Sequence, residues 1–187
     1  SAMKKILPLL FMLVTTTTIA QNKDYLLSLD GIGSLKLGMP FVELEKVLNS
    51  KIILKVINVD PVVLVETIKV KYKGIDVEIS LWKRQDYIAV DGISASSPLC
   101  KTKSGIGIGS NKLQIIAAYD GYHIDAKPVF EYEGDNKPKR IKTKSTVTVK
   151  EAEEGYAIIF NLVNNKVVSF DILPIYDGPN TSSPVIG

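Results

Sequence analysis

Cysteine and histidine each occur only once in this chain of 187 residues, and the formal net charge is only +3. A single cysteine cannot form a disulfide within the chain, so a disulfide-stapled scaffold is excluded. The same two counts exclude Cys/His zinc sites and catalytic sites built on histidine pairs. The small net charge gives no reason to expect a nucleic-acid partner. Because 45% of the residues are hydrophobic, we expect a folded protein rather than a disordered one.

The first twenty residues have the features of a targeting segment. Two residues that look like the remnant of an expression tag precede Met3, and a short basic region follows it. The apolar stretch at 6–14 is too short to span a membrane, and small residues follow at 18–20, where a signal peptidase would cut. We therefore expect residues 1–20 to be a signal peptide and the protein to be exported, periplasmic or secreted, with no permanent membrane span.

One short pattern occurs twice in the chain at a fixed offset. Residues 35–38 (Leu-Lys-Leu-Gly) correspond to residues 106–109 (Ile-Gly-Ile-Gly), and the same i, i+3, i+4 spacing of apolar residues follows both. Each copy predicts a strand, a glycine turn and a short helix with one face towards a core. The first helix is expected to begin at Pro40 and end at Asn49, and the second to begin after Ser110.

Alternating strands are predicted after each helix. Apolar residues occupy every second position of 75–81 and of 156–162, which is typical of strands with one buried face. The turn formers at 73–74 and 164–165 predict tight hairpins. Residues 141–150 also alternate, with lysines on one side, and this pattern favours an edge strand whose outer face is charged.

These elements predict an α+β fold of two tandem similar units, each a short helix packed on an antiparallel β-sheet. The first unit is expected to cover residues 21–100 and the second residues 101–175. The second unit carries an insertion at 122–150 that holds a loop by composition. Residues 176–187 are rich in turn formers and are expected to form a loose tail.

The two copies resemble a group of small extracytoplasmic domains. The resemblance is carried by residues 35–38 with Glu43-Leu44 after them, and by residues 106–109 with Gln114-Ile115 after them. This arrangement is similar to the SmpA/OmlA-type domains and to the tandem-repeat β-lactamase inhibitor proteins. The chain differs from them in having one helix per half and no disulfide. The resemblance implies protein binding on the open face of a sheet, with no catalytic residues to carry over.

Few residues offer a basis for catalysis or cofactor binding. Cys100 and His123, with Asp125 nearby in sequence, are the only nucleophile–base pair that can be drawn. A lone cysteine in a small domain is usually a packed thiol, and we favour that interpretation. The glycines at 105–109 lack the other residues of a phosphate loop and predict close packing instead. We expect no enzymatic activity, no cofactor and no metal.

The most concentrated run of basic residues lies at 137–144. Lys139, Arg140, Lys142 and Lys144 within it could bind an anionic polysaccharide or a lipid surface. The same run is equally typical of a solvated strand face, and we favour that simpler interpretation.

Trp82 is the residue most suggestive of binding. It shares the polar side of its strand with Glu78, and Lys69 and Lys71 of the neighbouring strand face the same side; Tyr87 is a further aromatic close by in sequence. An aromatic side chain among mixed charges is typical of a protein-binding surface. The alternative is a tryptophan that folds over the rim of the sheet.

The sequence therefore predicts an exported, non-enzymatic domain that binds another protein through an open sheet face. An inhibitor, an immunity-type factor and an envelope assembly factor all fit this description, and the partner protein itself is not specified by the sequence. The alternative function is a binding module for an anionic polysaccharide or lipid surface, which would use residues 137–144.

Overall fold

The chain is dominated by β-strands. The computed structural model describes residues 22–54, 64–84, 86–132, 137–151 and 155–175. Strands make up 56% and helices 13% of the structure. The expected signal peptide at 1–20 and the expected tail at 176–187 lie outside the described residues.

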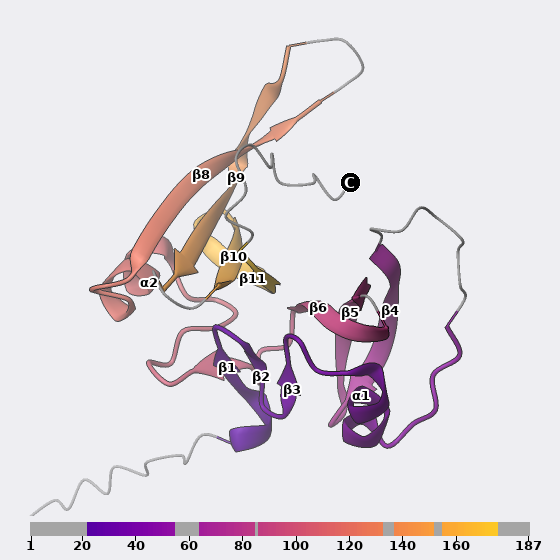
Figure 1. The fold of residues 1–187 in the computed structure, drawn as a ribbon. Helices are drawn as coiled ribbons and strands as arrows, with labels where there is room; N and C mark the ends of the chain where they lie inside the picture. The colour runs from indigo at the N-terminus through magenta and orange to yellow at the C-terminus, as the bar shows by residue number, and fades with distance from the viewer. Residues whose placement is uncertain (1–21, 55–63, 85, 133–136, 152–154, 176–187) are drawn as a thin grey trace, which may run out of the picture.

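A seven-stranded antiparallel sheet forms the main body of the protein (Figure 1). Its strands lie in the order β4 (Leu64–Tyr72), β5 (Ile75–Arg84), β6 (Tyr87–Ala95), β11 (Lys166–Pro174), β10 (Tyr156–Val163), β9 (Lys139–Lys150) and β8 (His123–Glu131). The central contact is the pairing of β6 with β11, in which Phe170, Asp171 and Ile172 face Ala95, Ser94 and Ile93. Strands from the two halves of the chain thus share one sheet.

A small second sheet and two short helices accompany the large sheet. The small sheet has the order β3 (Leu35–Lys36), β2 (Gly31–Ile32), β1 (Leu26–Ser28) and β7 (Lys101–Thr102), with η1 (Lys23–Tyr25) just before β1. Helix α1 (Phe41–Leu48) lies beside the β4–β5–β6 end of the large sheet, and α2 (Lys112–Ala118) lies beside the β8–β9 end (Figure 1).

Local sequence accounts for the turns and the helix ends. Lys73, Gly74, Asn164 and Asn165 all have positive φ, as the tight turns of the β4–β5 and β10–β11 hairpins require. Helix α1 follows Pro40 and ends at Asn49, which adopts the left-handed conformation. Helix α2 begins with a capping box between Asn111 and Gln114, so the N-cap is Asn111 and not the predicted Ser110.

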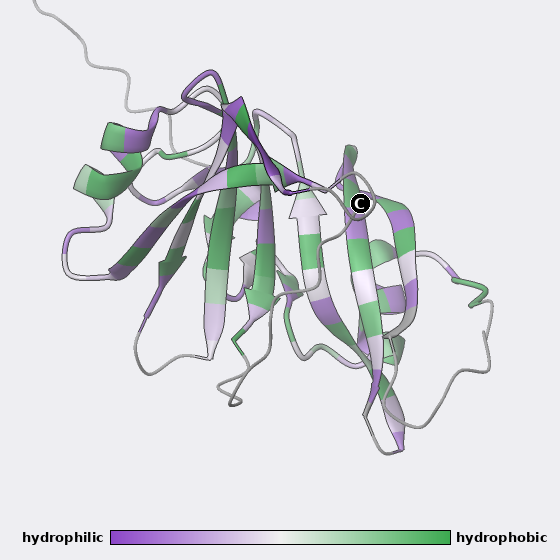
Figure 2. Ribbon diagram, turned by 90° about the horizontal axis from the view of Figure 1, so that it is seen from above, coloured by the Kyte–Doolittle hydropathy of each residue, from purple (hydrophilic) through white to green (hydrophobic). Residues whose placement is uncertain are grey.

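One hydrophobic core lies on a single side of the large sheet. The strands alternate between apolar and polar residues along their length (Figure 2), and the apolar set faces the helices and the small sheet. Ile79 of β5 and Phe160 of β10 are fully buried in the same cluster as Leu44 of α1 and Ile115 of α2. A common core therefore joins both ends of the sheet.

The expected α+β fold of two tandem helix-on-sheet units is wrong. The pairing of β6 with β11 makes a single large sheet instead of one sheet per unit. Each helix is only about two turns long, and each buries a single residue completely, Leu44 or Ile115, so neither helix can cover a sheet of its own. The proposed boundary between residues 100 and 101 is not tested by this shared sheet and stays a prediction.

The segment 122–150 also differs from expectation. Most of it forms the two long strands β8 and β9, which are joined through residues that are partly outside the described ranges. Strand β9 is paired on both sides, with β8 and with β10, so it is not the edge strand that its lysines suggested. The edges of the large sheet are β8 and β4.

Candidate functional site

The side of the large sheet that points away from the helices is the candidate binding surface, and we call it the outward face. The two sides separate cleanly in β5, where Ile75, Val77 and Ile79 are buried in the core and the intervening Asp76 and Glu78 are exposed. The register of the strands extends this division across the sheet, because residues that face each other on paired strands share a side.

One row of residues on the outward face crosses all seven strands. Strand pairing places its members side by side in the order Lys69, Glu78, Ser94, Asp171, Ile159, Thr148 and Asp125. All but one are polar. Because no member of the row is fully buried, the outward face remains in contact with solvent along its whole width.

At one end of the row, the β4–β5 hairpin carries two ion pairs. Lys69 Nζ lies 2.9 Å from Glu78 Oε1, and Lys71 Nζ lies 2.7 Å from Asp76 Oδ1. The hydrogen bond from Lys69 to Glu78 and their attraction raise the pKa of the lysine above its ordinary value. The lysine side chains are 81% and 68% exposed, so water screens both pairs.

Trp82 continues this surface along β5. It lies on the same side as Glu78, because Leu81 between them is completely buried, and the Trp82 side chain is half-buried. Strand register places Trp82 opposite Ala89 and Arg84 opposite Tyr87, so Tyr87, at the start of β6, lies on the same side of the sheet as Trp82. We call Lys69, Lys71, Asp76, Glu78, Trp82 and Tyr87 the β4–β5 face; the five residues of it that the sequence singled out all lie there.

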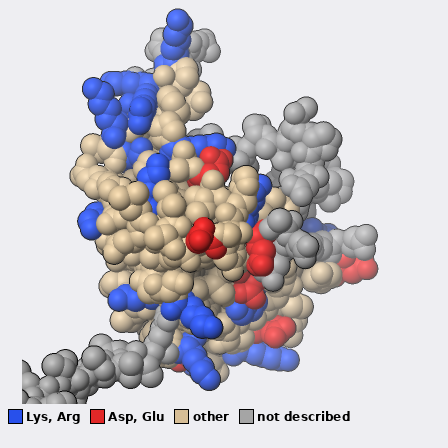
Figure 3. Space-filling view, turned by 90° about the vertical axis from the view of Figure 1, so that its left-hand side faces the viewer, with Lys and Arg blue, Asp and Glu red and all other residues tan. Residues whose placement is uncertain are grey.

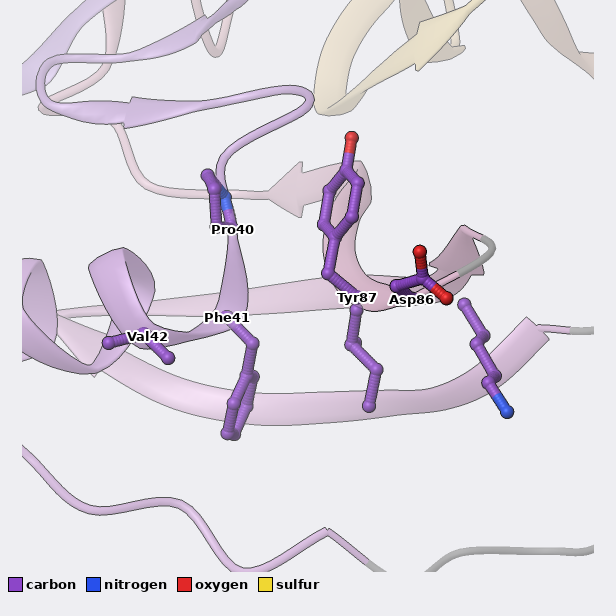
Figure 4. Close-up of a pocket in the computed structure, with 7 residues that line it drawn as sticks. Pro40, Phe41, Val42, Asp86 and Tyr87 are labelled. Atoms are coloured by element: carbon purple, nitrogen blue, oxygen red, sulfur yellow. The ribbon is translucent and has the colours of Figure 1, made fainter.

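A shallow pocket of about 380 Å³ lies at the edge of the β4–β5 face, between the start of α1 and the β5–β6 turn. In Figure 4 the Tyr87 ring points to one side of the strand, and the Phe41 ring points to the other. Tyr87 is 50% exposed. Its ring is therefore available on the outward side, at the margin of the pocket.

The centre of the outward face contains a hydrogen-bond network that the sequence analysis did not identify. The Asp171 carboxylate accepts hydrogen bonds from Ser94 Oγ at 2.5 Å and from Asn161 Nδ2 at 2.7 Å, and Asn161 also donates to Ser169 Oγ at 3.1 Å. The network links β6, β11 and β10. The alternation of polar and apolar residues in β10 and β11 predicts that Asn161 and Asp171 lie on a polar side. It does not predict the contact with Ser94, which is 77 residues away from Asp171 along the chain.

At the other end of the sheet, the β8–β9 hairpin projects beyond the body of the protein (Figure 1). The pairing breaks at Pro128, which has no N–H to donate, and Lys142, Thr143 and Lys144 have no partner on β8. Beyond this break, Val129–Glu131 of β8 pairs with Lys139–Ile141 of β9. The predicted residues of the alternative site, Lys139, Arg140, Lys142 and Lys144, are all exposed on this hairpin.

Basic side chains gather on this projection, as Figure 3 shows at the top of the molecule. Two aromatic side chains lie beside them: Phe130, directly opposite Arg140, is 42% exposed, and Tyr132, which the sequence had suggested as a weaker member of the Trp82 surface, is 63% exposed. We call Phe130, Tyr132, Lys139, Arg140, Lys142 and Lys144 the basic arm. The sequence signal for the aromatics was their position next to the basic run.

Cys100 and His123 do not form an accessible pair. The Cys100 side chain is completely buried, and burial raises the pKa of its thiol to about 11. His123 is exposed at the start of β8. Gly107 packs closely against the backbone of Cys100. A Cβ added to Gly107 would lie 2.5 Å from the Cys100 carbonyl oxygen, which explains why glycine occupies that position.

The described ranges offer no basis for a metal site or a membrane-spanning helix. They contain no group of three or more His, Cys, Asp or Glu side chains that could hold a metal ion. Neither α1, α2 nor η1 has the length and apolarity that a membrane-spanning helix requires.

Comparison with known proteins adds no family to these observations. No protein-family model, curated protein or solved structure matches the chain. The resemblance to SmpA/OmlA-type domains and to tandem-repeat β-lactamase inhibitors therefore stays a prediction, and the functional interpretation depends on the geometry of the outward face.

Proposed function

We propose that this protein is an exported, non-enzymatic domain that binds another protein through the β4–β5 face. The observation that carries the proposal is that Trp82 of β5 and Tyr87 of β6 lie on the same side of the sheet as two exposed ion pairs, which sit further along β4 and β5. Aromatic anchors surrounded by charged and polar groups are typical of protein-binding surfaces. An inhibitor, an immunity-type factor or an envelope assembly factor would each use such a surface.

The two ion pairs of the β4–β5 face are weak enough to be replaced by ion pairs with a bound protein. Exposed salt bridges contribute little to folding stability, because water already solvates and screens both charges. Lys69 and Lys71 can therefore turn from Glu78 and Asp76 to a partner's carboxylates without destabilising the sheet. Charges of both signs at the edge of an interface speed association and exclude wrong partners.

The central network supports the same proposal because it keeps the neighbouring strands in place. Asp171 joins β6 to β11 and, through Asn161, to β10, at the point where the two halves of the sheet meet. A surface that is already ordered loses less entropy on binding than a flexible one.

A comparative capture experiment tests this proposal. The wild-type protein, a Trp82→Ala, Tyr87→Ala double variant and a Leu113→Ala control are immobilised and exposed to extracts of the source cell envelope and medium. Leu113 is a matched control because it is 74% exposed and lies on α2, away from the β4–β5 face. We expect one protein to be enriched equally by wild type and control and lost with the double variant. Equal enrichment by all three proteins would contradict the proposal.

A further inference from the structure

We propose that the basic arm docks this protein onto an anionic phospholipid surface, independently of the β4–β5 face. The arm lies at the opposite edge of the large sheet, so a membrane bound there leaves the other end of the sheet accessible. The inference goes beyond the proposed function, because it assigns a second surface and a different class of partner.

The charge of the arm is the first support. Residues 137–144 contain five lysines and arginines, against three acidic residues in the preceding 131–136, so the arm has an excess of positive charge. Among the described residues, Lys139, Arg140, Lys142 and Lys144 make no ion pair, although Glu131 lies opposite Lys139 in the strand pairing. Their positive charge is thus available to lipid phosphates, which attract lysine and arginine side chains close to the bilayer surface.

The exposed aromatic side chains are the second support, and they favour lipid over a soluble polyanion. Phe130 and Tyr132 lie on the arm, outside the hydrophobic core, and leave 42% and 63% of their surface in water. Aromatic rings are stabilised at the boundary between headgroups and acyl chains, where basic side chains beside them reach the phosphates. An anionic polysaccharide or a nucleic acid offers sugar or base faces on which a ring can stack, but no apolar layer that a ring can enter.

The shape of the arm is the third support. Beyond Pro128 the hairpin is a narrow two-stranded ribbon with only three residue pairs, and it projects past the other strands (Figures 1 and 3). The described part of this ribbon, which carries Phe130 and Arg140, can meet a flat surface without a clash from the body of the protein. The ribbon is also too small to bury a core of its own, so its aromatics have no evident structural role.

Co-sedimentation of the full chain with vesicles tests the proposal. Vesicles of phosphatidylcholine alone are compared with vesicles of phosphatidylcholine and phosphatidylglycerol in equal parts. Because the leader has basic residues of its own, binding is assigned to the arm by comparing test and control variants that both keep the leader. The test variant is Arg140→Gln, Lys142→Gln, Lys144→Gln, and the matched control is Lys23→Gln, Lys46→Gln, Lys103→Gln, which removes three exposed lysines elsewhere.

We expect preferential binding to the anionic vesicles, and a loss of affinity on the order of 100-fold in the test variant alone. A second variant, Phe130→Ser with Tyr132→Ser, is expected to lose about tenfold, because half-exposed rings would no longer enter the lipid. Since all these side chains are exposed, folding is expected to be unchanged by circular dichroism.

Three results would overturn the assignment. They are equal binding to both kinds of vesicle, equal losses in the test and control variants, and an unchanged affinity when both aromatics are replaced. Binding to heparin or duplex DNA as tight as to the anionic vesicles would also overturn it, because a general polyanion site would then explain the charge.

Discussion

The two edge hairpins of the large sheet use lysine in opposite ways. In the β4–β5 hairpin, Lys69 and Lys71 each face an acidic residue on the paired strand and form an ion pair with it. In the β8–β9 hairpin, the basic residues of 137–144 follow one another along β9 and the two residues before it. No acidic residue lies within this range. The first arrangement produces a locally neutral, mixed surface, and the second a surface with an excess of positive charge.

This difference indicates why a small net charge is a poor guide to partners. The formal charge of +3 is a sum over the whole chain, so it does not show that one end of the sheet is ion-paired and the other is basic. A protein partner favours the mixed surface with its aromatics, whereas an anionic layer favours the basic arm. The following predictions test whether the two ends are parts of one fold with separate surfaces.

The largest expected effect comes from the core that both ends share. Ile79→Ala in β5 and Ile158→Ala in β10 each remove a completely buried side chain, one from each end. Each is expected to lower the free energy of unfolding by about 2–5 kcal/mol. Because the core is continuous, both variants should shift one common urea transition, followed by circular dichroism and by tryptophan fluorescence. Two transitions, each moved by only one variant, would show that the ends fold separately.

The next effect concerns Cys100, which lies in the same core. The folded thiol has a pKa of about 11, whereas an unfolded thiol ionises near its ordinary value of about 8.5. As the pH rises between these values the unfolded state loses a proton that the folded state keeps, so stability falls. The expected slope is about 1.4 kcal/mol per pH unit.

Cys100→Ala should flatten this part of the pH profile of unfolding. The burial of Tyr119 raises its pKa to about 12, so it adds a similar decline above the ordinary tyrosine range in both proteins. An identical slope in wild type and Cys100→Ala would show that the thiol is not the cause. In the folded protein we also expect slow labelling of Cys100 by thiol reagents at neutral pH.

A smaller effect is expected where the two ends meet. Asp171→Ala removes the acceptor for Ser94 and Asn161 and should lower the free energy of unfolding by about 2 kcal/mol. Ser169→Ala is the control, because Asn161 keeps its bond to Asp171, and its effect should be clearly smaller. Equal changes in urea midpoint for the two variants would mean that Asp171 does not hold the strands together.

The smallest effect on stability is expected at the β4–β5 face. Lys69→Glu places two carboxylates across from each other and should lower the urea midpoint slightly, more at low salt than at high salt. Adding Glu78→Lys restores opposite charges and should restore the midpoint. A double variant no more stable than Lys69→Glu would show that the ion pair is not formed in solution.

Several parts of the fold could be predicted from the sequence because they depend on neighbouring residues. Alternation correctly separated Ile79 from Glu78 in β5, and the positive φ of Asn164 and Asn165 follows from their turn preference. Both short helices were located within one or two residues. The grouping of Lys69, Lys71, Glu78 and Trp82 on one side of a hairpin required only local pairing.

The errors arose where distant segments meet. The alternation in β9 indicates one buried face but does not indicate whether one or two strands pair with it, so it was assigned to an edge. The repeated helix pattern suggested two separate units. The sequence around Ser94 and Asp171 contains no signal that their strands, β6 and β11, are neighbours, so the shared sheet was not predicted. Phe130 of the basic arm was missed because an exposed ring and a buried ring have the same sequence signature, and Tyr132 was assigned to the Trp82 surface instead of the arm.

Local patterns along the chain set which side of each strand is apolar, where the hairpins turn and where the helices begin, since these depend on side chains a few residues apart. The pairing of β6 with β11 emerges only in the folded protein, and with it one sheet that has two chemically different ends. The physical reason is that strand pairing uses backbone hydrogen bonds, which every residue except proline can make alike. The choice of neighbour is made by the burial of the whole apolar face at once.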